Sequence, residues 1–321
     1  LNVWDFLNIE QRAGVMTFSD AYKTFLDAAK TEREAVAVAE SLLREAGFQP
    51  LEEFPDLKPG DKIYTVIRQK ALVAAVIGKA PLAKGLHLLG AHIDSPRLDL
   101  KPQPLYEEDE LVLLKTHYYG GIKKYQWLSV PLALHGVVIK NNGNSIPIVI
   151  GENPGDPVFT VSDLLPHLAK DQMDKKMMDA VPGEGLNILA GGIPLAGEGL
   201  KERYKLAVLD FLYRNYSITE EDLISAELEL VPAWPARDIG LDRSFVGGYG
   251  QDDRVCAYTA LRACLEISNP ERTALLVLAD KEEIGSTGNT GMTAMFFANA
   301  VAEIASRCGP DYSELVLRRI L

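Results

Sequence analysis

Three short clusters of acidic and histidine residues are candidates for chemistry, and they lie far apart in the sequence. They are His92-Ile-Asp94, Asp252-Asp253 and Glu282-Glu283. Imidazole and carboxylate groups are ligands that zinc and related divalent metals use in catalytic sites. Each cluster follows a predicted buried strand or precedes a predicted helix, and in open α/β sheets ligand sites form at the carboxyl ends of strands. The sequence therefore predicts that folding brings the three clusters together.

The His-x-Asp spacing allows the two side chains of the first cluster to cooperate. In an extended segment, residues i and i+2 point to the same side, so Asp94 can approach the imidazole of His92. A carboxylate in this position fixes the histidine tautomer and raises the basicity of the ring, which suits a metal ligand. The alternative is a histidine at a strand end that binds a carboxylate for structure alone.

Adjacent glutamates can divide the work of metal binding and proton transfer. The side chains of Glu282 and Glu283 point in different directions, so one can hold a metal while the other faces the water bound to it. A metal lowers the pKa of its water, and a nearby carboxylate can take the proton and pass it to a leaving amine. The alternative is a solvated charged surface, which the apolar strand before the pair disfavours.

The Asp252-Asp253 pair precedes a predicted helix and has two interpretations. In the structural interpretation, one aspartate is the helix N-cap and the other is a favourable charge at the helix dipole. In the functional interpretation, Asp252 bridges two cations, because a carboxylate has two oxygens and two-metal sites hold their ions about 3.5–4 Å apart. Asp253 remains a candidate for the N-cap.

An α/β scaffold is predicted to position these clusters. Apolar runs at 85–91 and 272–279 predict buried strands that end directly before His92 and Asp280. The pattern after Asp253 predicts a helix over 254–267, and a capping box at Thr31-Glu-Arg-Glu34 predicts the start of another. Further scaffold elements are predicted as strands at 62–67 and 71–77 and as a helix at 292–307.

The texture of the sequence changes between the first cluster and the second. From about residue 101 the strand patterns are not separated by helices, and a turn at Asn141-Asn-Gly-Asn144 joins predicted strands at 132–140 and 146–150. A short helix near 205–213 and an alternating strand at 226–231 follow. We therefore predict an inserted β-rich domain at 103–236, with a catalytic α/β domain formed by 1–102 and 237–321.

Composition and charge restrict the class of protein. The 321 residues carry a formal net charge of −12, which disfavours electrostatic binding to nucleic acid or to anionic membranes. No apolar run is long enough to cross a membrane, and the first segment lacks the layout of a secretory signal, so a cytoplasmic protein is predicted. Cys256 and Cys264 have no CxxC spacing, and we expect them to share one buried helix face.

Three motifs around the clusters closely resemble the aspartyl aminopeptidase family. They are Gly90-Ala-His-Ile-Asp-Ser-Pro-Arg-Leu-Asp-Leu-Lys-Pro102, Gly247-Gly-Tyr-Gly-Gln-Asp-Asp-Arg254 and Asp280-Lys-Glu-Glu-Ile-Gly-Ser-Thr-Gly288. The resemblance extends over essentially the whole chain. It implies a zinc-exopeptidase-like, three-layer α/β/α catalytic domain with an inserted β-rich domain used for oligomer contacts. It also implies a metalloaminopeptidase that removes N-terminal residues, typically Asp or Glu, from peptide substrates through a metal-activated water.

The resemblance also implies a role for each residue of the clusters. His92 binds one zinc ion, Asp252 bridges two, Glu283 binds the other, Glu282 is the general base and Asp94 orients the histidine. The implied cofactor is a pair of Zn²⁺ ions, for which Co²⁺ or Mn²⁺ could substitute.

A further histidine and an oligomeric state are implied by the same resemblance. His167 resembles the family histidine that reaches from the inserted domain toward the active site of a neighbouring subunit. Considered without the family, a single histidine beside apolar residues is a structural residue. The implied assembly is a homododecamer built from dimers.

The chain departs from the family pattern in its last part. The family completes its site with an Asp and a final His downstream of the Glu-Glu motif, but this chain has no histidine after His167, and Asp311 lacks the family context. The sequence also stops within a predicted helix that starts at Ser313. We therefore expect the C-terminal part to be absent, so that each zinc lacks one protein ligand within residues 1–321 and the activity of this segment alone is in doubt.

Two alternatives to an acid-specific aminopeptidase remain open at this point. One is a related two-metal aminopeptidase of broader specificity, because the ligands and the base do not encode the side chain that is removed. The other is a catalytically inactive assembly or binding module with a vestigial metal site. An acidic substrate residue needs a cationic partner, and Arg254 and Lys281 are near in sequence, although either could equally be structural.

Overall fold

The computed structural model describes residues 2–197 and 199–309, which form two compact units. Unit 1 comprises Leu1–Ser95 and Pro235–Leu321, and unit 2 comprises Pro96–Trp234. The second unit thus begins a few residues before the predicted position 103, because the strand that starts at Arg97 already belongs to its sheet. The helix predicted to start at Ser313, and Asp311 with it, lie outside the described residues.

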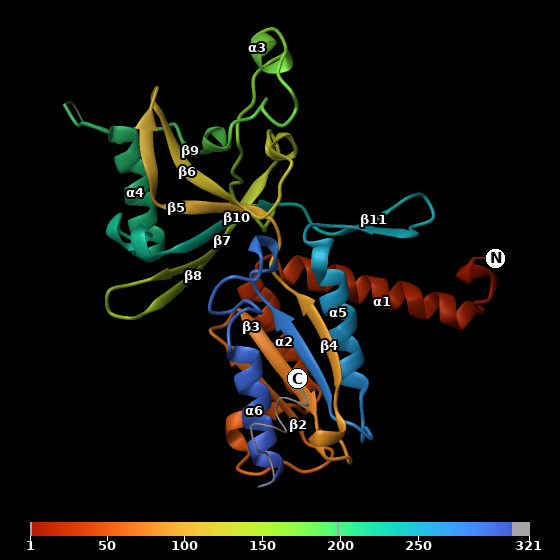
Figure 1. The fold of residues 1–321 in the computed structure, drawn as a ribbon. Helices are drawn as coiled ribbons and strands as arrows, with labels where there is room; N and C mark the ends of the chain where they lie inside the picture. The colour runs from red at the N-terminus through yellow and green to blue at the C-terminus, as the bar shows by residue number, and fades with distance from the viewer. Residues whose placement is uncertain (1, 198, 310–321) are drawn as a thin grey trace. The chain divides into compact units, whose positions relative to one another are not determined.

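A five-stranded mixed sheet forms the centre of unit 1 (Figure 1). Its order is β1-β2-β3-β13-β4, in which β13 runs parallel to β4 and antiparallel to β3. The strands predicted at 62–67, 71–77 and 272–279 are confirmed by these elements. The strands are β1 (Gln49–Pro50), β2 (Lys62–Ile67), β3 (Ala71–Val76), β4 (His87–His92) and β13 (Ala274–Ala279).

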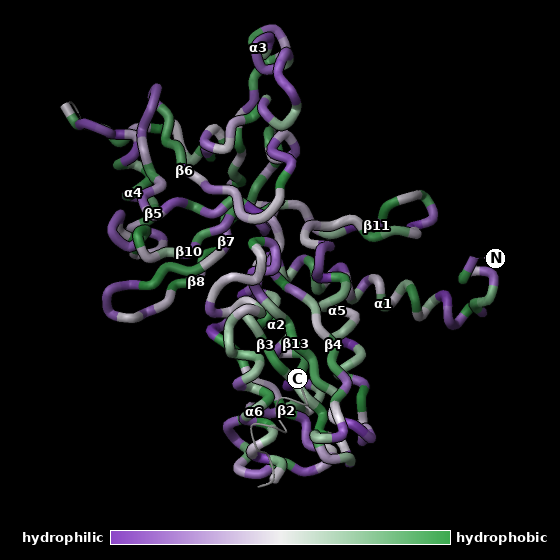
Figure 2. The backbone as a smooth tube through the Cα atoms, viewed as in Figure 1, coloured by the Kyte–Doolittle hydropathy of each residue, from purple (hydrophilic) through white to green (hydrophobic). Residues whose placement is uncertain are grey.

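Helices cover both faces of this sheet. On one face, alternate residues such as Leu72 and Leu276 pack against α1 (Ile9–Ala28), α2 (Glu32–Glu45) and α5 (Gln251–Glu266). On the other face, Val73 and Leu275 pack against α6 (Phe296–Cys308). Because successive strand residues face opposite sides, strands buried on both faces are apolar throughout, as the green colour of β3 and β13 in Figure 2 shows. The predicted three-layer α/β/α arrangement is confirmed.

Local sequence signals account for several boundaries of these elements. The capping box predicted at the start of α2 is present, since the Thr31 side chain accepts from the backbone N–H of Glu34 and the Glu34 side chain accepts from that of Thr31. The expectation for the cysteines is wrong in part. Cys264 is buried against the sheet, but Cys256 is exposed. A spacing of eight residues rotates the second side chain about 80° around the helix, enough to leave one of the two outside the core.

The prediction of a buried strand at 85–91 is also wrong in part. The strand exists as β4, but among the described residues it pairs with β13 alone and so lies at one edge of the sheet. Leu88 is therefore 51% exposed. An apolar run does not distinguish a central strand from an edge strand, because the distinction depends on which neighbours are present.

Unit 2 is built on a six-stranded antiparallel sheet. Its order is β8-β7-β10-β5-β6-β9, and the hairpin predicted around residues 141–144 is confirmed by the pairing of β7 with β8. The strands are β5 (Arg97–Glu108), β6 (Leu111–Tyr119), β7 (Leu132–Ile139), β8 (Ser145–Ile150), β9 (Ile188–Gly191) and β10 (Glu227–Pro232). Helix α4 (Arg203–Tyr216) packs against β5, β6 and β9. An apolar cavity of about 500 Å³ lies between α4 and the sheet of unit 2, and its lining includes Leu105, Leu134 and Phe211.

Several short elements complete the two units. A two-stranded ribbon of β11 (Arg237–Ile239) and β12 (Phe245–Gly247) precedes α5, and the short α3 (Lys170–Met173) lies in the long polar stretch of unit 2. No helix in the described part of the chain is both long enough and apolar enough to cross a membrane. The 3₁₀ turns are Val3–Asp5, Leu51–Glu53, Leu82–Lys84, Lys124–Trp127, Gly183–Gly185, Glu221–Ser225 and Glu282–Ile284.

Candidate metal centre

The parallel pairing of β4 and β13 places the first and third clusters at the same end of the unit 1 sheet, where the carboxyl ends of the two strands lie next to each other. The register sets His92 opposite Ala279, and the N–H of Ile93 donates to the carbonyl oxygen of Ala279 at 2.8 Å. Both strands end at this point, so the chain after β4 and the chain after β13 leave the sheet side by side. Glu282 and Glu283 follow within four residues of Ala279.

Asp94 is fully buried and connects these two segments. Its two carboxylate oxygens accept the backbone N–H groups of Glu282 and Glu283, each at 3.1 Å. One of the same oxygens lies 3.3 Å from Nδ1 of His92, and the Asp94 carbonyl oxygen lies 3.1 Å from that nitrogen. A single carboxylate thus fixes both the imidazole and the start of the double-glutamate turn.

Asp252 approaches the histidine from the start of α5. Its backbone, like that of Asp253, has non-helical angles, and the peptide bond between them is cis. As assigned, α5 starts at Gln251, but its regular helical part follows the kink at Asp252 and Asp253, so the interpretation of Asp253 as the N-cap of that part stays a prediction. The side chain of Asp252 is 84% exposed, and its Oδ1 lies 3.2 Å from Nε2 of His92.

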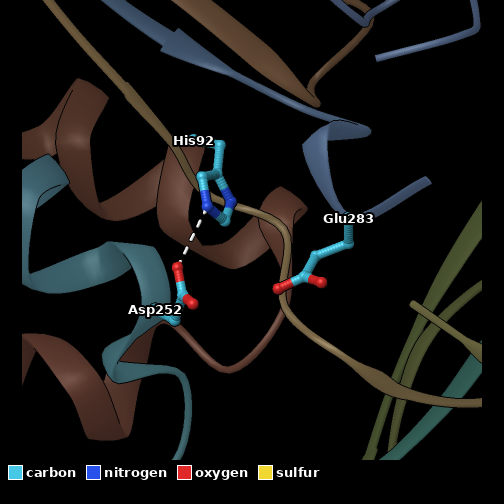
Figure 3. A group of neighbouring side chains, drawn as sticks. All are labelled: His92, Asp252 and Glu283. Carbon is cyan, nitrogen blue, oxygen red and sulfur yellow. Dashed lines mark hydrogen bonds and ion pairs between the residues drawn. The ribbon is translucent and has the colours of Figure 1, made fainter. Parts of the chain in front are cut away.

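Three side chains from the three clusters converge at one point (Figure 3). One atom each from His92, Asp252 and Glu283 lie within 4.8 Å of one another, a spacing in which all three can contact one ion. Glu282 is exposed beside them, with Oε2 3.7 Å from Nε2 of His92. Residues separated by up to 191 positions in the sequence therefore form one group on one unit.

The electrostatic environment of the group is strongly acidic. Burial lowers the pKa of His92, but the hydrogen bond and the charge of Asp94 outweigh burial and raise that pKa to about 9. Burial raises the pKa of Glu283, and repulsion from Asp252, Asp94 and Glu282 acts in the same direction, although His92 opposes it. Four carboxylates thus surround one imidazole, and a divalent cation would relieve their mutual repulsion.

The donor set fits a zinc ion. Imidazole nitrogen and carboxylate oxygen are both zinc ligands, and catalytic zinc sites leave a position open for water or substrate. The nitrogen of His92 that faces Asp252 and Glu282 is Nε2, while Nδ1 faces Asp94. This is the arrangement in which an outer carboxylate fixes the tautomer of a metal-binding histidine.

Other candidate residues lie outside this group. His167 belongs to unit 2, where it is exposed in a turn before α3. Lys281 has its ammonium group 3.7 Å from a carboxylate oxygen of Asp280. Arg254 is buried with only 1% of its surface exposed, so it cannot contact a substrate from its present position.

Two buried residues that the sequence arguments did not single out contribute to the site. Asp280 is fully buried and accepts from the Thr290 hydroxyl at 2.5 Å and from the Lys281 N–H at 2.8 Å. These hydrogen bonds fix the start of the double-glutamate turn. Ser95 donates to the carbonyl oxygen of Asp252 at 2.9 Å. The signal available for both was a polar residue within three positions of a predicted ligand, Ser95 after His92 and Asp280 before Glu283.

The comparison with known proteins agrees with this geometry. The family model described as aminopeptidase I zinc metalloprotease (M18) matches residues 25–318. A probable M18 family aminopeptidase 1 from Clostridium acetobutylicum is 50% identical over 324 residues, covering 100% of this chain and 70% of that protein. A protein of the same description from Thermotoga maritima is also 50% identical, over 320 residues that cover 100% of this chain and 69% of that protein.

Solved structures give the same result. The crystal structure of an M18 family aminopeptidase from Thermotoga maritima superposes with a TM-score of 0.94 at 50% identity, covering 100% of this chain and 69% of that one. The S. cerevisiae mApe1 dodecamer has a TM-score of 0.72 at 20% identity, covering 94% of this chain and 68% of that one, and so shares the fold. This chain belongs to the M18 family of zinc-dependent aminopeptidases.

Proposed function

We propose that this aminopeptidase removes acidic N-terminal residues from peptides with a pair of zinc ions held by His92, Asp252 and Glu283. The observation that carries the proposal is the convergence of these three donors within 4.8 Å beside the exposed carboxylate of Glu282. Structural ion pairs bring one cation to one carboxylate, whereas this group has a surplus of carboxylates at the open edge of a sheet. Such a surplus is suited to binding cations.

Asp252 is the ligand proposed to contact both ions. Its two oxygens are on an exposed side chain, one of them lies 3.2 Å from Nε2 of His92, and Glu283 belongs to the same group of donors. When bound, a zinc pair lowers the pKa of water and polarises the substrate carbonyl, and cobalt or manganese could supply the same chemistry. By binding Nδ1, Asp94 would leave Nε2 of His92 available to hold a metal ion.

Glu282 is proposed to hold and move the proton. Its carboxylate is exposed, so it can accept a proton from the attacking water and deliver it to the nitrogen of the departing peptide. The backbone N–H of Glu282 donates to Asp94, which holds the base in a fixed relation to the histidine. The same carboxylate of Asp94 therefore orients one ligand and the base.

The test of the base is peptide turnover by Glu282→Gln in the metal-loaded full-length protein. The variant keeps the shape of the side chain but cannot accept a proton, so kcat is expected to fall by about 10²–10⁴-fold. Zinc content measured on the same sample should equal that of the wild type. If Glu282→Gln retains most of its rate with zinc bound, the assignment of the base is wrong.

The metal content also separates the alternatives. Two zinc ions per chain in the full-length wild-type protein, with turnover of a peptide substrate, support the enzyme. Protein that binds no zinc but still forms stable oligomers would instead be an assembly module with a vestigial site.

The preference for acidic residues rests on the resemblance to the aspartyl aminopeptidase family. Neither of the two cations near the clusters in sequence supports it, since Arg254 is buried and the ammonium group of Lys281 lies near Asp280. A panel of peptides that differ only in the N-terminal residue tests the preference. Higher kcat/KM for Asp and Glu is expected, and equal values for Leu and Asp would favour the broader-specificity alternative.

Self-association is proposed on two grounds. The yeast protein mApe1, which shares the fold, forms a dodecamer, and unit 2 exposes apolar side chains around its long polar stretch, such as Leu165, Leu168 and Met178. We propose a homododecamer built from dimers, in which His167 reaches a neighbouring site. Mass photometry of the wild type and of His167→Ala, together with kcat, tests both parts. The cytoplasmic location stays a prediction from the sequence.

A further inference from the structure

A buried arginine, Arg254, is connected to the candidate metal centre by hydrogen bonds. The guanidinium of Arg254 donates through Nη1 to the Ser95 hydroxyl at 3.0 Å and through Nη2 to the Lys30 carbonyl oxygen at 3.0 Å. A Cβ at Gly250 would lie 1.8 Å from Nη1, and Gly250 also has a φ of +79°, so this position requires glycine. The loop before α5 is therefore built around the arginine.

The hydroxyl of Ser95 continues the chain of hydrogen bonds to a proposed ligand. It accepts from Arg254 and donates to the backbone carbonyl of Asp252 at 2.9 Å. Ser95 is 1% exposed and lies three residues after His92, in the segment that also carries Asp94. One hydroxyl thus joins the segment of the histidine ligand to the segment of the bridging aspartate.

Asp252 depends on such a connection more than the other proposed ligands do. Its side chain is 84% exposed, so packing restrains it little, and the position of its carboxylate follows from its backbone. Charge on the guanidinium polarises the Ser95 hydroxyl and strengthens the hydrogen bond that the hydroxyl donates to Asp252, because linked hydrogen bonds reinforce one another.

We infer that Ser95 and Arg254 are positioning residues that set the separation of His92 and Asp252 and thereby the zinc affinity of the site. The inference rests on the proposed ligand roles. Both residues are only 1% exposed, and neither belongs to the group of donors formed by His92, Asp252 and Glu283. Arg254 acts through Ser95, and Ser95 acts through the backbone of Asp252.

The experiment compares Ser95→Ala with Thr273→Ala as a matched control. Thr273 is likewise 1% exposed, and its hydroxyl accepts from the Gly78 N–H at 3.0 Å. It lies directly before the first residue of β13, whereas Asp280 follows the last residue of that strand. Zinc dissociation constants are measured by competition with a chromophoric chelator, and cobalt-substituted protein reports the geometry of the site by its visible absorption. Ser95→Thr restores the hydroxyl.

Ser95→Ala is expected to raise the zinc dissociation constant by about 10–100-fold and to change the cobalt spectrum, as for loss of other groups that orient metal ligands. Thr273→Ala is expected to lower the melting temperature of metal-free protein as much as Ser95→Ala does, yet to leave the zinc dissociation constant within about twofold. Ser95→Thr should bind zinc more tightly than Ser95→Ala.

Three results would overturn the inference. They are wild-type zinc affinity in Ser95→Ala, an equal loss of affinity in Thr273→Ala, and a zinc affinity of Ser95→Thr no better than that of Ser95→Ala. If Ser95→Ala does not fold, the comparison of Ser95→Thr with wild type by the cobalt spectrum decides, since a retained hydroxyl should retain the spectrum. Failure of the proposed function itself would appear differently, as wild-type protein that binds no zinc or as full activity in Glu282→Gln.

Discussion

Each unit of the molecule contains a histidine beside a carboxylate, and the two arrangements differ in charge balance. In unit 2, Nε2 of the buried His135 lies 3.0 Å from Glu152, and the neighbouring Glu229 lies 3.1 Å from Arg97, so each carboxylate has a cationic or histidine partner. In unit 1, His92 faces Asp94 through one nitrogen and Asp252 and Glu282 through the other.

The comparison indicates how a structural ion pair differs from a group of residues that binds a cation. A buried charge is tolerated when a partner compensates it, and removal of one partner then destabilises the protein because the other charge is left buried without compensation. Where several carboxylates converge on one imidazole and remain open to water, the protein alone does not balance the charge. Changes at the two places should therefore have separate effects, on catalysis in unit 1 and on stability in unit 2.

The largest effect is expected from Asp252→Asn. Loss of a proposed bridging ligand should reduce kcat/KM by more than the roughly 100-fold that follows removal of a group that only orients a metal ligand. Because the side chain is exposed, urea unfolding of the metal-free variant should occur at the wild-type concentration. Peptide turnover and zinc content measure the first effect, and fluorescence-monitored urea titration measures the second. A variant that keeps its zinc and its rate would remove Asp252 from the site.

A smaller and purely structural effect is expected from Glu152→Gln. The change removes the charge from a partly buried hydrogen bond to His135, so the free energy of unfolding should fall by about 1–3 kcal/mol. Hydrogen exchange should locate the loss in β7, which carries His135, and in the segment directly after β8, which carries Glu152. Zinc affinity and kcat should stay within about twofold of wild type. A fall in zinc affinity would break the distinction between the two histidines.

The smallest effect is expected from Asp222→Asn at low pH. The N–H of Thr219 and the ammonium group of Lys140 bind the Asp222 carboxylate, and the hydrogen bond from Thr219 is the main reason that its pKa is lowered. A lowered pKa gives stability that is present above the unfolded value of about 3.9 and is lost as the pH falls through the folded value.

Urea midpoints at about pH 6 and about pH 3 test this expectation. Wild-type protein should lose more stability between the two conditions than Asp222→Asn does, because the variant has no carboxylate to protonate. An equal loss in both proteins would mean that the contacts of Asp222 do not contribute to acid sensitivity.

Patterns within single segments predicted much of the scaffold. Short apolar runs gave β3 and β13, the capping box gave the start of α2, and the Asn-Gly turn gave the β7–β8 hairpin. These features depend on local hydrogen bonds and on short runs of apolar side chains, which a sequence states directly.

Features that depend on distant neighbours were not accessible in this way. The edge position of β4 depends on its pairing, and the buried side of α5 depends on where the helix meets the sheet, so Leu88 and Cys256 are more exposed than expected. The start of α5 also differs, since the assigned helix begins at Gln251 and includes a kink at Asp252 and Asp253 that no local pattern indicates. Arg254 showed no signal for burial, since arginine is ordinarily exposed.

The parallel register of β4 and β13 restricts where the chain length of this protein can vary. Adding or deleting one residue inside β4 would turn the side chain of His92 to the opposite face of the sheet, away from Glu283. The loops at the other end of the same strands, at 78–86 and 268–273, are distant along both strands from the catalytic edge. Natural insertions and engineered fusions should therefore be accepted in those two loops and rejected within the strands.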